Sequence, residues 1–150
     1  MASFVFRLQN VLDYRAGVAD RARQELGVLQ TYLREAAATL SALLGAEQKA
    51  LRTLGTAQSS EILDLPEITR LLEYGQVLAQ EIVEQRFHVE ERCRDVAAQQ
   101  QKVIALAKDA KALEKLRERQ LEEYQQDDNR RAQSETSEIA SARHQRLQVS

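Results

Sequence analysis

The sequence predicts an all-α fold in which two long helices form an antiparallel coiled-coil hairpin, with the second helix longer than the first. The first observation is composition. With one proline, five glycines and no tryptophan among 150 residues, the chain has few helix breakers and few bulky groups for a globular core. The second is an apolar repeat of seven residues over the first third of the chain. The third is that helix breakers gather in one stretch, at 55–65.

The first helix is expected over residues 4–54, where the repeat predicts a narrow apolar seam. With Leu26 at a heptad a position and Leu29 at d, thirteen of the fifteen seam positions are apolar, and Arg15 and Glu47 are the exceptions. The apolar a positions are Val5, Leu12, Ala19, Leu26, Leu33, Leu40 and Leu54, and the apolar d positions are Leu8, Ala22, Leu29, Ala36, Leu43 and Ala50.

A turn is expected at about 55–65 and a second helix at about 66–142, in a single domain that covers residues 1–150. Asp64 and Glu67 have the spacing of a capping box, and Pro66 lies in the first helical turn, where its missing N–H costs little. Folding back here pairs residues 4–54 with about 66–118 and leaves the second helix unpaired from about Leu121. The apolar seam positions of this helix are Ile68, Leu71, Leu78, Ile82, Val89, Val96, Val103, Leu106, Ala110 and Leu113.

The second seam is interrupted by Gly75, Gln85, Arg92 and Gln99, and the sequence leaves the register of the two helices open. In one interpretation, long polar side chains reach water from an open seam and make the register more specific. In the other, the two glutamines and Arg92 loosen a stretch that a partner later engages. The unpaired end has the mixed charges of a solvated helix. A long helix without a partner is marginal in water, which favours a docking role for this end.

Several function classes lack support in the sequence. A formal charge of −2 provides no net field for nucleic acid or anionic lipid, and no apolar run reaches the roughly 20 residues that span a bilayer. Cys93 is the single cysteine, which indicates a reducing compartment, and His88 and His144 lack the clustered ligands of a metal site. We therefore expect a cytoplasmic protein that is not an enzyme, needs no cofactor or metal, and is a monomer when free.

Two stretches resemble a known family. FVFRLQNVLDYR at residues 4–15 and LEKLRERQLEEY at residues 113–124 resemble the two end signatures of FliJ, the small coiled-coil protein of the bacterial flagellar export apparatus. Length, hairpin architecture and the longer second helix agree over essentially the whole chain. The resemblance implies a stalk-like protein that binds the hexameric export ATPase and links it to the cytoplasmic domain of the export gate. It also implies peripheral association with the inner face of the membrane.

The resemblance further implies that the two chain ends form an ATPase-binding tip and that the gate binds early in the second helix. An exposed aromatic pair next to arginine and tyrosine is a suitable anchor for a protein interface. The expected tip residues are Phe4, Phe6, Arg7, Leu8, Val11, Arg117, Gln120, Leu121 and Tyr124, and the gate segment includes Tyr74, Leu78, Ile82 and Gln85. The alternatives are an adaptor for export chaperones, the equivalent stalk of a virulence type III secretion system, and a parallel homodimer with a scaffold role.

Overall fold

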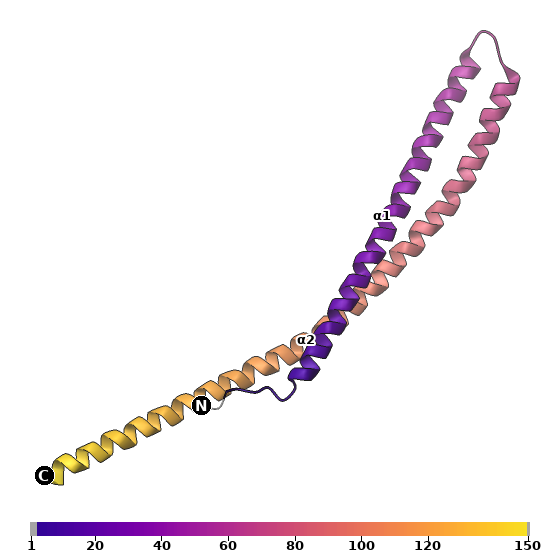
Figure 1. Cartoon of the computed structure of the whole chain (residues 1–150). Helices are drawn as coiled ribbons and strands as arrows, with labels where there is room; N and C mark the ends of the chain where they lie inside the picture. The colour runs from indigo at the N-terminus through magenta and orange to yellow at the C-terminus, as the bar shows by residue number, and fades with distance from the viewer. Residues whose placement is uncertain (1–2, 150) are drawn as a thin grey trace. The chain divides into compact units, whose positions relative to one another are not determined.

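The computed structural model describes residues 3–149, which form the helices α1 (Gln9–Ser59) and α2 (Leu65–Val149) joined by a short turn (Figure 1). The two helices are antiparallel and α2 is the longer, which confirms the predicted all-α hairpin. The contacts divide the chain into two compact units. The end unit comprises Met1–Ala19 and Ala105–Ser150, and the hairpin unit comprises Asp20–Ile104. The single-domain organisation expected from the sequence stays a prediction.

The turn of the hairpin unit is shorter than predicted, because α1 continues to Ser59 and does not end at residue 54. A helical glycine costs only about 1 kcal/mol relative to alanine, which is too little for Gly55 to end a long packed helix. The hydroxyl of Ser59 donates to the Gly55 carbonyl at 2.7 Å within this last turn. The start of α2 agrees with the prediction, since Asp64 Oδ1 accepts the Glu67 backbone N–H at 3.3 Å as an N-cap.

The predicted seam holds the hairpin unit together. Leu78 and Ile82 of α2 are 4% and 5% exposed, and the predicted seam positions of α1 and α2 in this unit are all buried or half-buried. Ala22, Ala36 and Val96 complete the fully buried set within this unit. Burial of one large aliphatic side chain contributes roughly 1.5–3 kcal/mol. Because the seam repeats over many turns, its summed burial offsets the cost of ordering two long helices.

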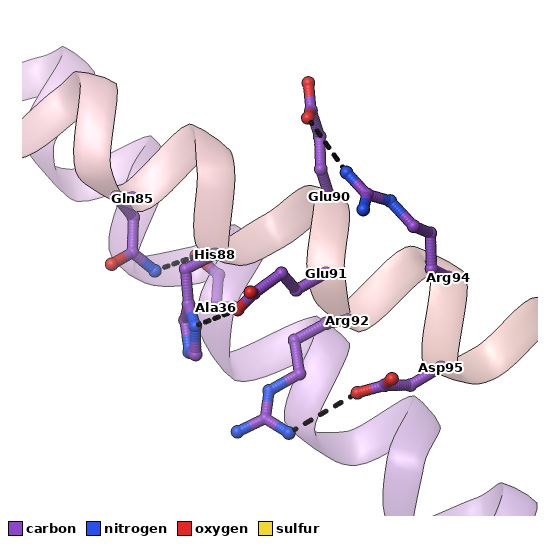
Figure 2. A network of polar contacts seen from close by, with 8 residues as sticks. All are labelled: Ala36, Gln85, His88, Glu90, Glu91, Arg92, Arg94 and Asp95. Carbon is purple, nitrogen blue, oxygen red and sulfur yellow. Dashed lines mark hydrogen bonds and ion pairs between the residues drawn. The ribbon is translucent and has the colours of Figure 1, made fainter.

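The polar interruptions of the seam also contact α1 (Figure 2). The amide of Gln85 donates to the backbone carbonyl of Ala36 at 3.0 Å, and the amide of Gln99 donates to that of Ala22 at 3.0 Å. The residue numbers of each pair add up to 121, so both glutamines belong to one register. Small alanine side chains leave these carbonyls within reach of an amide. These contacts support the interpretation in which the interruptions specify the register, and they oppose the one in which they loosen the seam.

Arg92 lies between the two glutamines in sequence and also contacts α1. Its guanidinium carbon is 5.0 Å from the centre of the Tyr32 ring, within the range of a cation–π contact. The same guanidinium is 3.8 Å from the Asp95 carboxylate on its own helix, as Figure 2 shows. The arginine therefore covers the edge of the seam with its stem and keeps its charge paired near water.

In the end unit, α1 begins at Gln9 and not at residue 4 as predicted, because residues 3–6 have no regular secondary structure and residues 7–8 form a turn. Phe6 is only 5% exposed, so tertiary burial of this side chain outweighs the local helical pattern. The predicted seam is otherwise preserved, with Leu12, Ala19 and Ala110 buried. Arg15, the polar d position, is half exposed and lies 3.6 Å from the Asp109 carboxylate.

The C-terminal part of α2 extends to Val149, beyond the predicted end at about residue 142. Its side chains are all exposed from Gln125 to Val149. The fully exposed stretch thus begins after Tyr124, and not near Leu121, because Leu121 and Tyr124 are half-buried. Throughout the described chain, neither helix has an apolar stretch long enough to cross a membrane.

Candidate functional site: the paired chain ends

An aromatic cluster joins the two chain ends within the end unit. The rings of Phe4 and Tyr124 have their centres 5.7 Å apart and are tilted by 50°, an arrangement favourable for aromatic pairs. The guanidinium carbon of Arg117 lies 5.9 Å from the centre of the Phe4 ring. Arg117 Nε also donates to Gln9 Oε1 at 3.0 Å. Arg117 of α2 therefore contacts both Phe4, which precedes α1, and Gln9, the first residue of α1.

The structure brings together three of the nine tip residues expected from the sequence, Phe4, Arg117 and Tyr124. The prediction that Phe4 and Phe6 form an exposed aromatic pair is wrong, because Phe6 is buried and Phe4 is half-buried. Both phenylalanines lie in the non-helical residues before α1, and Phe4 contacts Tyr124 and Arg117 of α2. Of the remaining expected residues, Arg7, Leu8, Val11 and Gln120 are exposed and Leu121 is half-buried.

An exposed apolar flank lies beside this cluster at the start of α1. Leu8, Val11 and Tyr14 are exposed, and their three-residue spacing places them along one side of the helix. Tyr14, 65% exposed, was not among the tip residues expected from the sequence. Val5 and Leu8 were expected at a and d positions of the seam, and this is wrong: they are 79% and 38% exposed, because α1 begins only at Gln9. Gln9 was missed too, although it lies within the first resembling stretch. The sequence feature that could have indicated an exposed Tyr14 is its position outside the a and d positions of the seam, where a large aromatic side chain does not face the partner helix.

The expected gate segment is only partly accessible. Tyr74 is half exposed, whereas Leu78 and Ile82 are buried in the seam and Gln85 bonds to α1. The expectation that Leu78 and Ile82 form a contact surface is therefore corrected, because both side chains pack against α1. The large exposed apolar side chains in and near this segment are Leu72, Val77, Val83 and Phe87.

An apolar groove of about 280 Å³ lies between α1 and α2 next to this segment. Leucines from both helices line it, and Gly75 contributes no side chain there, so the seam is thin at this point. Its lining includes Leu51, Leu54, Leu71, Leu72, Gly75 and Ala79. The groove and the exposed residues of α2 supply apolar side chains along the hairpin unit.

The described residues offer little for catalysis or metal binding. In residues 3–149, no group of three or more histidine, cysteine or acidic side chains is placed to hold a metal ion. Cys93 is exposed, and His88 lies 3.9 Å from the Glu91 carboxylate on the same helix. What the surface does offer is two apolar areas suited to protein partners, one in each unit.

Comparison with known protein families gives a match to the family model described as Flagellar FliJ protein, over residues 4–148. The chain belongs to the FliJ family. The match spans both chain-end stretches that carry the resemblance, FVFRLQNVLDYR and LEKLRERQLEEY. No curated protein and no solved structure matches the chain.

Membership of the FliJ family makes the chain a component of the bacterial flagellar export apparatus. Members of this family are structural, non-catalytic components of that apparatus, and the family indicates a cytoplasmic one. The family match also favours a flagellar system over the virulence type III system considered as an alternative. For this FliJ-family chain, the aromatic cluster of the end unit and the apolar groove of the hairpin unit are the two candidate partner sites.

Proposed function

We propose that this FliJ-family protein is a stalk-like element that binds the flagellar export ATPase hexamer through its chain ends and links the ring to the export gate. The observation that carries the proposal is the exposed flank of Leu8, Val11 and Tyr14 beside the Phe4–Tyr124 cluster. Aromatic side chains and arginine are enriched in protein interfaces, and the flank and cluster supply Tyr14, Phe4 and Arg117. Tethering to the gate would also account for peripheral association with the membrane.

Binding to the ATPase is tested by titrating the full chain into the purified export ATPase and measuring both association and turnover. We expect Val11→Asp to abolish association, because the change places a charge in the middle of the flank. Val28→Asp is the matched control, since Val28 is a similarly exposed valine of α1 in the hairpin unit. Equal losses in the two variants, or no loss in either, would remove the flank as the binding surface.

The gate contact is proposed for the apolar groove and the neighbouring exposed residues of α2. Val83 and Phe87 are one helical turn apart and are both exposed. We expect Val83→Asp with Phe87→Asp to weaken binding to the cytoplasmic domain of the gate while ATPase binding persists. Loss of both interactions would indicate general damage to the chain and would contradict separate sites for the two partners.

An adaptor role for export chaperones is the second candidate, and one observation favours it. The stretch of α2 from Gln125 to Val149 is fully exposed, and it carries the apolar side chains of Ile139 and Leu147. A chain truncated after Gln125 should lose chaperone binding and keep ATPase binding if the two roles use separate surfaces.

Light scattering on the free chain distinguishes the monomer that we expect from the parallel homodimer.

A further inference from the structure

Residues 4–8 precede α1, are not helical, and contact α2 through their aromatic side chains. Phe6 is 5% exposed, whereas the neighbouring Val5 is 79% exposed. Phe4 contacts Tyr124 and lies under the guanidinium of Arg117. Side chains that alternate between buried and exposed are typical of an extended strand docked on a surface. In this conformation the segment covers the face of α2 that includes Arg117 and Tyr124.

The local sequence does not favour the observed start of α1. Leu8 stands at the N-cap position, where leucine is unfavourable, and the first turn contains no acidic residue. Ser3, by contrast, is a good N-cap residue for a helix that would begin at Phe4. The heptad repeat also continues through Leu8 to Val5. Helical propensity and tertiary contacts therefore favour different conformations of the same five residues.

The two conformations bury different side chains of similar size. The observed one buries Phe6 and half-buries Phe4, while Val5 and Leu8 are exposed. In a helical one, the repeat turns Val5 and Leu8 toward the seam and moves the two phenylalanines off it. Because comparable apolar areas are exchanged, a partner that binds one conformation better can shift the population toward it.

We propose that residues 4–8 are a two-state latch, which is docked on α2 in the free chain and extends α1 by about one and a half turns when a partner binds. In the helical state the latch uncovers the face of Arg117 and Tyr124 and presents Phe4 and Phe6 as an exposed aromatic pair. Leu8 then leaves the exposed flank for the seam, and Val11 and Tyr14 remain as the part of the flank that the partner contacts. This proposal rests on the proposed function for the identity of the partner, the export ATPase.

Residue 7 offers a substitution that separates the two states. The Gln9 N–H donates to the Phe6 carbonyl at 3.1 Å, which makes Arg7 the second residue of a tight turn. Proline is favoured at that position of common turns, so Arg7→Pro is compatible with the docked latch. Proline also keeps the preceding residue, Phe6, out of the helical region, so the same change prevents the helical extension. Arg7→Ala removes the same charge and permits both states.

The two-state behaviour is tested on the free chain by backbone carbon chemical shifts of residues 4–8. In Phe6→Ala, which removes the buried side chain of the latch, we expect these shifts to become helical. In the double variant Phe6→Ala with Arg7→Pro, we expect no helical shifts. A segment that becomes disordered in Phe6→Ala, with random-coil shifts, would overturn the helical alternative.

The control of binding is tested with the purified export ATPase. We expect Arg7→Pro to bind at least tenfold more weakly than Arg7→Ala, because only the proline variant is confined to the docked state. Equal affinities would overturn a regulatory role for the latch. If neither the unaltered chain nor Arg7→Ala binds, the proposed function fails and the regulatory role fails with it, while the chemical shifts still decide whether the segment has two states.

Discussion

The hairpin unit and the end unit stabilise helix pairing in different ways. In the hairpin unit, a repeated seam with buried residues such as Leu78 and Ile82 distributes burial over many turns. Polar contacts at regular intervals, from Gln85 and Gln99 to backbone carbonyls, accompany that seam. In the end unit, a non-helical segment and one arginine, Arg117, provide most of the specific contacts between the chain ends.

This difference concerns how stability is shared among residues. A repeated seam tolerates the loss of one small contact, because neighbouring heptads hold the helices in place. The chain ends depend on Phe6, Phe4 and Arg117, so a single change there has a local effect that neighbouring heptads do not compensate. Regions used for binding and conformational change are commonly drawn from the less stable parts of a protein, which agrees with a partner site at the chain ends.

The largest effect is expected from the seam itself. Replacement of Ile82 by alanine removes a buried side chain and should lower the free energy of unfolding by about 3 kcal/mol. Denaturant unfolding followed by circular dichroism measures this loss. The neighbouring Val83 is exposed, and Val83→Ala should stay within about 0.5 kcal/mol of the unaltered chain. Similar losses in both variants would contradict the assignment of the seam.

A smaller and local effect is expected from Arg117→Ala in the end unit. The change removes the hydrogen bond to Gln9 and the contact with Phe4, and it should lower local stability by about 1.5 kcal/mol. Amide hydrogen exchange should accelerate about tenfold at residues 9–19 and stay unchanged in the hairpin unit. Arg119→Ala, a change at an exposed position nearby, serves as the control. Acceleration throughout the chain would contradict the independence of the two units.

The contact between Arg92 and Tyr32 should contribute less. A double-mutant cycle with Arg92→Ala and Tyr32→Ala is expected to give a coupling of about 0.5–1 kcal/mol, because the arginine is partly exposed. Denaturant unfolding of the unaltered protein, the two single variants and the double variant measures this coupling. A coupling near zero would show that the two side chains lie close together without stabilising each other.

The smallest change in stability, with a clear change in register, is expected from Gln85→Leu combined with Gln99→Leu. Leucine fills the space of glutamine with apolar atoms, so the free energy of unfolding should change by no more than about 1 kcal/mol. The register should become less specific, because the bonds to Ala36 and Ala22 are lost. Distances between spin labels at Thr31 and Glu90, with Cys93 replaced by serine, should broaden. An unchanged distribution would show that the apolar seam alone sets the register.

Much of the candidate site could be anticipated from the sequence. Resemblance to the FliJ family indicated that residues near Phe4 and Tyr124 meet, and the structure places those two rings in contact. The burial of Phe6 could not be anticipated, because it lies in a non-helical segment where the heptad pattern predicts helix. Leu78 and Ile82 of the expected gate segment are not accessible to a partner, since these side chains are buried in the seam against α1.

By itself, the sequence determined the class of fold and the place of the turn. Heptad spacing of leucine and alanine requires a partner helix, and Asp64 and Pro66 provide a local start for α2. Only the tertiary structure decided the register, the start of α1 at Gln9 and the burial of Phe6. These features depend on contacts between residues far apart in sequence, such as Gln9 with Arg117. Local propensity contains no information about such contacts, and a few buried side chains outweigh it.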